Sequence, residues 1–322
     1  MTRIAVPLPQ SAATRPTASG GTAWTALPGG RGARHLAEPL PPAQLQNILA
    51  DLARSQPRHR TQPLPVHKLE FPKLPAALTV AAIVAARDEA ATLPLVVHQL
   101  QRLPLLELIV VANGCVDGTA EAARSAGCRV IEYREPLGHD VGRALGAAQT
   151  QAEICLFADA DIVLGAEYFM PFLLATAQGV DIALNDPRPF IPVPDAVSTA
   201  KEFLNTALGR KDLGYASMTS VPHALRRSAI QRIGLDRLAV PPLAQAVGVL
   251  EGLLVRAVAN VDVISTNRVH PLDSQPRSPR LLEETILGDH LEALQYVLRR
   301  QGARGGFSDA GRRRDLLTRP DP

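Results

Sequence analysis

Two carboxylates, Asp159 and Asp161, have the residue type and spacing of a metal site. They lie between two apolar runs, residues 154–158 and 162–164. Carboxylates at positions i and i+2 just past a strand can share one hard divalent cation, Mg²⁺ or Mn²⁺, while a bound diphosphate supplies further oxygens. The same spacing is common in turns and at the start of helices, so the pair alone does not decide between the two readings.

The elements upstream of the pair must position it. Residues 78–86, 107–112, 128–133 and 154–158 have the apolar composition of strands. A helix is predicted after each of the first three strands; these helices are marked by Leu93, Val96, Val97 and Leu100, by Thr119 as an N-cap, and by Arg143 and Gly146. Strands that alternate with helices predict an α/β fold with a mostly parallel sheet.

Such sheets bind ligands outside the carboxyl ends of their strands. The polar residues that follow the predicted strands should therefore converge on one edge of the sheet: Arg87, Glu89, Asn113, Asp117, Arg143, Asp159 and Asp161.

Four segments in this order resemble the family 2 glycosyltransferases, which have the GT-A fold. They are Arg87-Asp88-Glu89, residues 112–119 (Ala-Asn-Gly-Cys-Val-Asp-Gly-Thr), Gly142-Arg143-Ala144 and Asp159-Ala160-Asp161. The family pattern reads Asn-Glu-Glu, Asp-Asp-Gly-Ser-x-Asp-Gly-Thr, Ala-Arg-Asn and Asp-x-Asp. The resemblance is good over residues 78–164 and loose over residues 180–271. Agreement in the order and spacing of four segments carries more weight than any one motif.

The resemblance implies a nucleotide-diphospho-sugar transferase fold, with a mostly parallel central sheet flanked by helices. It implies transfer of a sugar from a nucleotide-diphosphate donor to a glycan, a lipid-linked molecule or a small molecule. The donor would contact Ala86, Glu89, Asn113, Asp117, Arg143 and Asp159. Mg²⁺ or Mn²⁺ would be held by Asp159 and Asp161, and by His270, because in some GT-A enzymes a histidine after the last core strand completes the metal shell.

Two departures from the family pattern leave the mechanism open. Asn113 replaces a carboxylate that contacts the nucleobase, so the nucleobase of the donor is not identified. Pro241 and Pro242 stand where inverting members carry an acidic pair that includes the catalytic base. The candidate bases in the second half are Asp186, His223 and Glu251, although His223 also fits a structural histidine and Glu251 a helix-end carboxylate. Inversion and retention at the anomeric carbon both stay open.

The remaining elements complete the predicted organisation. Helices are expected at 166–178, 196–208, 224–233 and 281–300, the last of them covering the sheet or a neighbour, and strands at 180–184 and 261–264. Residues 1–66 predict a flexible extension with one short helix at 42–54. Residues 67–302 form the expected catalytic domain, with a nucleotide-binding half to residue 164 and an acceptor half from 165, and residues 303–322 form a basic tail.

Composition fits a cytoplasmic enzyme. The formal charge of +3 over 322 residues is too small to argue for nucleic-acid binding. Three cysteines without metal-ligand spacing suit a reducing compartment, and neither a membrane span nor a signal peptide is evident. Arg312-Arg313-Arg314 fits a solvated tail; the alternative is peripheral contact with anionic lipid at the inner membrane surface, or with a phosphorylated acceptor.

Two alternative functions are also compatible with the sequence. The missing acidic pair is consistent with a degenerate family member that binds a nucleotide sugar or a protein partner without turnover. A sugar nucleotidyltransferase shares the alternating architecture, but such enzymes carry a Gly-rich loop with Arg and Lys after the first strand, which residues 85–89 lack.

Overall fold

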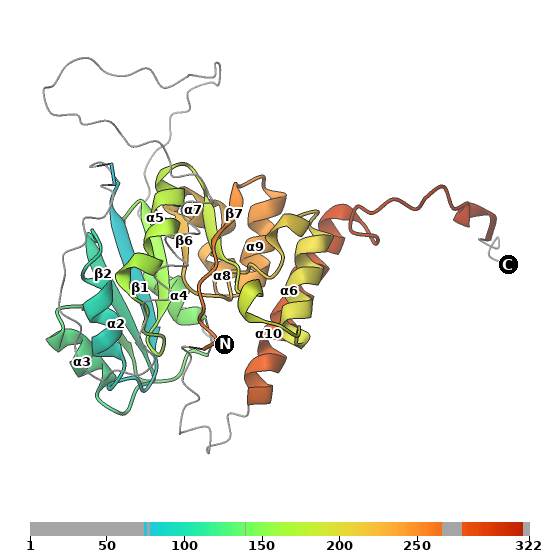
Figure 1. Ribbon diagram of the computed structural model, residues 1–322. Coiled ribbons are helices and arrows are strands. Elements are labelled where there is room, and N and C mark those ends of the chain that lie inside the picture. Colours follow the sequence, from blue (N-terminus) through green and yellow to red (C-terminus); the bar gives the residue numbers. More distant parts are fainter. Residues whose placement is uncertain (1–73, 76–77, 139, 266–278, 318–322) are drawn as a thin grey trace, which may run out of the picture. The chain divides into compact units, whose positions relative to one another are not determined.

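Seven strands form one sheet in the order β3-β2-β1-β4-β6-β5-β7, with helices on both faces (Figure 1). The structure, a computed structural model, describes residues 74–75, 78–138, 140–265 and 279–317. The helix predicted at 42–54, the domain boundary near residue 66 and His270 lie outside the described residues.

The first half of the domain is built from parallel strands joined by helices. Strands β1 (Val80–Ala86), β2 (Glu107–Asn113), β3 (Arg129–Tyr133) and β4 (Ile154–Asp159) pair in parallel. They are connected by α2 (Leu93–Leu100), α3 (Thr119–Ser125) and α4 (Val141–Ala148). Each predicted strand of this half is confirmed to within two residues.

The start of α3 differs from the prediction. The N-cap is Gly118, whose φ of 89° is left-handed, and Thr119 is the first residue of the helix. Asp117 explains the difference, because its Oδ1 accepts a hydrogen bond of 3.0 Å from the Thr119 backbone N–H and so takes over the capping role. The Thr119 hydroxyl is thereby left to accept a 2.7 Å hydrogen bond from the backbone N–H of Glu89.

The second half of the domain is less regular. It contains the strands β5 (Ile182–Asn185), β6 (His223–Arg226) and β7 (Val255–Ala259). Its α-helices are α5 (Met170–Ala177), α6 (Ala196–Ala207), α7 (Arg227–Ile233), α8 (Leu235–Leu238), α9 (Pro241–Leu250) and α10 (Pro279–Gln301). Short 3₁₀ turns are η1 (Ala166–Tyr168), η2 (Arg188–Phe190), η3 (Lys211–Leu213) and η5 (Arg314–Leu317).

Strand β6 corrects the prediction of a helix from residue 224. It lies antiparallel between β4 and β5, whereas β7 is parallel to β5, so the sheet is mostly but not wholly parallel. The reason lies in the alternation of its side chains: Ala224 packs in the hydrophobic cluster on one face of the sheet and Leu225 in the cluster on the other. The helix begins only at Arg227.

The last strand is also displaced from its prediction at 261–264. Strand β7 ends at Ala259, and Val261 is paired with a side chain instead of a neighbouring strand. The Asn185 amide donates to the Val261 carbonyl at 3.1 Å and accepts from the Val261 N–H at 2.8 Å. This amide pairing satisfies the buried backbone beyond the end of the strand.

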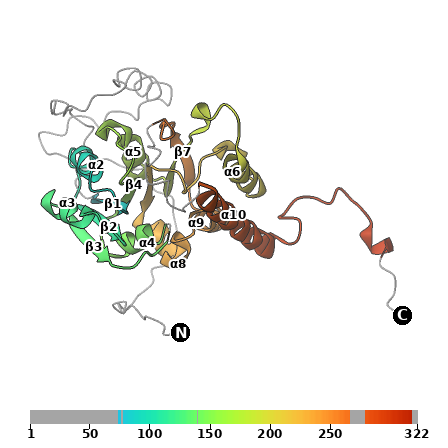
Figure 2. The same ribbon diagram turned by 90° about the horizontal axis from the view of Figure 1, so that it is seen from below.

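The two faces of the sheet are covered by different helices. One buried cluster joins β1 and β4 to α2 and α5, and the other joins β4 and β5 to α4, α7 and α9. Helix α10 packs alongside α9 and α6 (Figure 2), so it covers neighbouring helices, as one of its two predicted placements has it. Within the described ranges, no helix has both the length and the apolar character needed to cross a membrane.

Helix α4 lies unusually close to β1. A Cβ atom added at Gly146 would lie 2.5 Å from Ile83 Cγ2, so only glycine permits this approach. The close packing fixes the start of α4, and with it Arg143, at the carboxyl edge of the sheet.

Candidate functional site

The carboxyl ends of β1, β2 and β4 meet at one edge of the sheet. Ala86 pairs with Ala112 on β2, and Ala85 pairs with Asp159 on β4. Asn113 and Asp159 end strands that flank β1 on either side and are offset by two residues in register, so they lie roughly 12 Å apart at the usual strand spacing and rise. The edge therefore brings a polar amide and a carboxylate to the two ends of a span that a nucleoside diphosphate can bridge.

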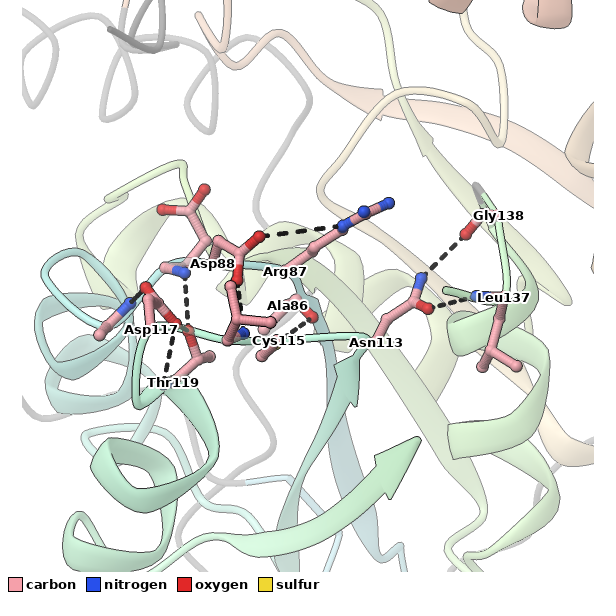
Figure 3. Close-up of polar contacts among 12 residues, drawn as sticks. Ala86, Arg87, Asp88, Asn113, Cys115, Asp117, Thr119, Leu137 and Gly138 are labelled. Atoms are coloured by element: carbon pink, nitrogen blue, oxygen red, sulfur yellow. Dashed lines mark hydrogen bonds and ion pairs between the residues drawn. The ribbon is translucent and has the colours of Figure 1, made fainter. Parts of the chain in front are cut away.

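Carboxylates tie the loop after β1 to the loop after β2 (Figure 3). Asp88, at a left-handed φ of 55°, accepts a 2.8 Å hydrogen bond from the Val116 N–H. Asp117 accepts a 2.9 Å hydrogen bond from the Ala90 N–H. Burial opposes ionisation of Asp117, but its hydrogen bonds from Thr119 and Ala90 outweigh that effect and lower its pKa. Asp117 is therefore an ionised carboxylate whose oxygens are engaged in holding the two loops together.

The other residues of these loops border the same edge. The Ala86 carbonyl accepts a 3.4 Å contact from the Cys115 thiol, and Glu89 is 7% exposed. Arg87 lies with its Nε 4.0 Å from Asp88 Oδ2, and Figure 3 shows its side chain between Asp88 and Asn113.

Asn113 uses its amide to hold the loop that follows β3. Its Nδ2 donates to the Gly138 carbonyl at 2.9 Å, and its Oδ1 accepts from the Leu137 N–H at 2.6 Å. A carboxylate could not make the first of these bonds, because it has no proton to donate. The asparagine that departs from the family pattern thus has a structural role, and one amide proton and one lone pair remain for a ligand.

Arg143 pairs with two carboxylates. Its Nη2 lies 2.5 Å from Asp159 Oδ1, and its Nη1 contacts Asp140 Oδ1. Burial disfavours the charged guanidinium, but the charges of Asp159 and Asp140 outweigh burial and raise the pKa of Arg143. Its Nε is buried and has no hydrogen-bond partner among the described residues. Asp140 was missed by the sequence analysis, although its position three residues before Arg143 at the start of a helix is a usable signal.

The residues present fit a hard divalent cation. Asp159 ends β4 with its side chain 24% exposed, and Asp161, two residues on, is also partly exposed. Carboxylate oxygens are the ligands that Mg²⁺ and Mn²⁺ prefer, and a bound diphosphate supplies the same ligand type. No group of three or more His, Cys, Asp or Glu side chains that could hold a metal occurs among the residues that the structure describes.

His223 opens β6 opposite Phe157, two residues before Asp159. It is 2% exposed, stacks on the Phe157 ring at a centroid distance of 4.9 Å, and its Nδ1 lies 3.1 Å from the Ser220 carbonyl oxygen. Burial, reinforced by the charge of Arg143, lowers the pKa of His223 to about 3. The side chain is therefore neutral at physiological pH and lies near the Arg143–Asp159 pair.

Of the other two candidate bases, only Asp186 lies at this edge. It follows β5, is 4% exposed, and binds Arg188 through a 2.6 Å ion pair. β6 alone separates β5 from β4, so Asp186 and Asp159 lie about 10 Å apart. Glu251 instead caps the C-terminus of α9 ahead of β7, at the opposite edge, where its Oε1 pairs with Arg300 at 3.1 Å.

We expect stability to fall in acid because of two buried histidines. His223 and His290 have pKa values lowered to about 3 and about 4, mainly by burial, against about 6.5 in the unfolded chain. Between these values the unfolded chain binds more protons, so the free energy of unfolding should fall by about 1.4 kcal/mol per pH unit for each histidine as pH drops below 6.5. Urea unfolding of wild type and His223→Gln at several pH values measures this; equal slopes in the two proteins would contradict the burial of His223.

The chain is similar in sequence to one protein family and in fold to solved structures. The model of the family described as Glycosyl transferase family 2 matches residues 81–234. The structure of glucosyl-3-phosphoglycerate synthase from Mycobacterium tuberculosis with Mn²⁺, uridine-diphosphate and phosphoglyceric acid has a TM-score of 0.51 at 20% identity, and covers 73% of this chain and 81% of that chain. The complex of the same enzyme with Mn²⁺, UDP-glucose and phosphoglyceric acid has a TM-score of 0.50 at 21% identity, with 73% and 83% covered.

No curated protein sequence matches this chain. At about one residue in five identical, the solved structures establish the shared fold. Together with the family match, they confirm the resemblance read from the four sequence segments. Residues 81–234 thus match the model of glycosyl transferase family 2, and the chain has the GT-A fold.

Proposed function

We propose that this protein transfers a sugar from a nucleotide-diphosphate donor to an acceptor, with Mg²⁺ or Mn²⁺ bound at Asp159 and Asp161. One observation carries the proposal: the sheet edge that ends in Asp159 also holds buried Arg143 beside it and Asn113 roughly 12 Å away. The similar structures support it, because glucosyl-3-phosphoglycerate synthase was crystallised with Mn²⁺ and UDP-glucose.

Each residue has a role that its surroundings allow. Ala86, Glu89, Asn113 and Asp117 border the nucleoside, where their contacts fix the two loops and the segment 137–138. Arg143 holds the Asp159 carboxylate and adds positive charge beside the diphosphate. When bound, the metal supplies charge that stabilises the leaving diphosphate. His270, which lies outside the described residues, remains a predicted third metal ligand.

The test is calorimetric titration of UDP into the protein with MnCl₂ and then with EDTA. Binding should require the cation, because the two carboxylates and the diphosphate repel one another without it. Equal affinity with and without EDTA would remove the metal from the proposal, and no binding in either case would exclude a uridine nucleotide as the donor.

We expect the reaction to proceed without a dedicated protein base. Pro241 and Pro242 begin α9 at the position where inverting members carry an acidic pair. The Asp186 carboxylate is paired with Arg188. His223 is neutral, and its low pKa makes it a weak base. In front-face retention the leaving phosphate accepts the acceptor proton. Asp186→Asn, His223→Gln and Glu251→Gln should therefore each keep kcat within about tenfold. A thousandfold loss in one variant, with UDP binding intact, would instead identify the base of an inverting enzyme.

Residues 1–60 should be dispensable for donor binding. They carry few apolar residues for a core and precede β1. A shortened chain that begins at Gln62 should unfold cooperatively and bind UDP with Mn²⁺ as the full chain does. Loss of either property would show that the segment 42–54 belongs to the catalytic fold.

The cytoplasmic location and the contact of the tail with anionic lipid also stay predictions. The structure bears on the charge of the tail, because Asp309 pairs with Arg304, Arg312 and Arg314. This pairing reduces the positive charge that the tail offers to a membrane.

A further inference from the structure

Lys201 is a cation with unmet hydrogen-bonding capacity in the acceptor half. It lies on α6, and its Nζ donates a 2.9 Å hydrogen bond to Ser220 Oγ. The described residues offer it no other hydrogen bond and no ion pair within 4.0 Å. An ammonium group has three protons to donate, so two are available to a ligand.

The surroundings of Lys201 enclose the amine. Part of the side chain is exposed, yet burial lowers the pKa of Lys201 to about 8, against the opposing effect of the charges of Asp195 and Asp186. Both carboxylates are committed elsewhere. Asp195 caps α6 by accepting from the Ser198 N–H at 2.7 Å, and Asp186 binds Arg188 through both of its oxygens.

Helix α10 places a buried histidine, His290, near Lys201. His290 is 1% exposed, its Nδ1 lies 2.7 Å from the Ile286 carbonyl oxygen, and its Nε2 has no partner among the described residues. Burial, with a smaller effect of the Lys201 charge, lowers the pKa of His290 to about 4, so this side chain is neutral. The amine is therefore influenced by two carboxylates that bind other groups, and a neutral imidazole lies near it.

A second cation stands near the same carboxylate. Arg188 pairs with Asp186, and its guanidinium lies against Gly214, where an added Cβ would be 2.3 Å from Arg188 Cζ. Its side chain is 47% exposed, so it can also reach a ligand. Ser220 links this region to the donor edge, because its carbonyl contacts His223, which stands opposite Phe157 on β4.

We propose that Lys201, with Ser220 and Arg188, binds a phosphate or carboxylate group of the acceptor. An oxyanion here would accept the two remaining ammonium protons of Lys201 and pair with a guanidinium, both of which are strong charge-assisted bonds. The inference rests on the proposed glycosyl transfer, and names its acceptor as an anionic molecule whose charged group binds two strands away from the donor phosphates.

Lysine-directed NMR tests this, because the chain has only four lysines: Lys68, Lys73, Lys201 and Lys211. Labelling with ¹³Cε-lysine leaves the three protons of each ammonium group in place and gives each amine its own Hε–Cε signal, and Lys201→Arg assigns the signal of interest. Titration with inorganic phosphate, and separately with acetate, is compared with sodium chloride at equal ionic strength. A bound oxyanion should raise the pKa of the Lys201 amine by about 1 and leave that of exposed Lys211 unchanged.

The two oxyanions distinguish a phosphate from a carboxylate acceptor group, and Ser220→Ala should reduce the response without abolishing it. An unchanged Lys201 signal with both oxyanions overturns the inference. UDP with diamagnetic Mg²⁺ is a further titration. A rise in the pKa of Lys201 equal to that with phosphate would assign the site to the donor and would also overturn the inference. Because the calorimetric binding of UDP is measured separately, failure of this site is distinguishable from failure of the proposed function.

Discussion

Asp161→Asn should lower the affinity for UDP in the presence of Mn²⁺ at least tenfold, about 1.4 kcal/mol, and lower the rate of donor cleavage about a hundredfold. The change keeps the shape of the side chain and removes its charge. The binding loss follows because the neutral amide offsets less of the cation's charge. The larger loss in rate follows because the cation stabilises the charge that develops on the leaving diphosphate. Calorimetry and nucleotide-release assays measure the two effects.

Asp212→Asn is the matched control. Asp212 is an exposed carboxylate that pairs with Arg210 in the second half, away from the strand ends that carry Asp159. It should leave both UDP binding and donor cleavage unchanged. If Asp161→Asn behaved as this control does, the metal role of the Asp159–Asp161 pair would be wrong.

Arg143→Met should cost about 3–5 kcal/mol of the free energy of unfolding, the scale for breaking a buried ion pair by removing one partner. The side chains of Arg143 and Asp140 are 6% and 3% exposed, and the substitution leaves the Asp140 carboxylate without its guanidinium. Asp159 would also lose the contact that orients it. Urea unfolding measures the cost, and UDP binding reports on the orientation of Asp159.

Two further variants make this result specific. Arg143→Met combined with Asp140→Asn also removes the carboxylate charge that has lost its guanidinium, and should recover part of the lost stability. Arg124→Met removes an exposed arginine that also contacts two carboxylates, Glu121 and Glu132, and should change stability little. Equal losses for Arg143→Met and Arg124→Met would show that the Asp140–Arg143–Asp159 cluster does not stabilise the fold.

The first half of the fold could be predicted because its signals are local. Each strand there is an apolar run followed by a helix with its own periodicity, so β1, β2 and β4 bring their polar ends to one edge by topology alone. In the second half the signals are not local. Strand β6 has four residues that continue directly into α7, and only its pairing with β4 and β5 makes it a strand.

The sequence predicted which residues belong to the site better than it predicted the contacts between them. The amide of Asn113 binds Leu137 and Gly138, which lie 24 and 25 residues away in the chain. Lys201 bonds to Ser220, 19 residues on, and neither residue belongs to a recognisable motif. Glu251 was a candidate because it lies near the expected acidic pair in sequence, but β7 begins at the opposite edge and takes Glu251 there.

A screen of nucleotide sugars for cleavage to water, with Mn²⁺ present, tests whether this protein is a glycosyltransferase. Release of the nucleoside diphosphate identifies the donor without knowledge of the acceptor. We predict that at least one nucleotide sugar is cleaved, and that EDTA and Asp161→Asn each suppress the release. Failure to cleave any nucleotide sugar, by a folded protein that binds UDP with Mn²⁺, would contradict glycosyl transfer and leave a nucleotide-sugar-binding protein without turnover.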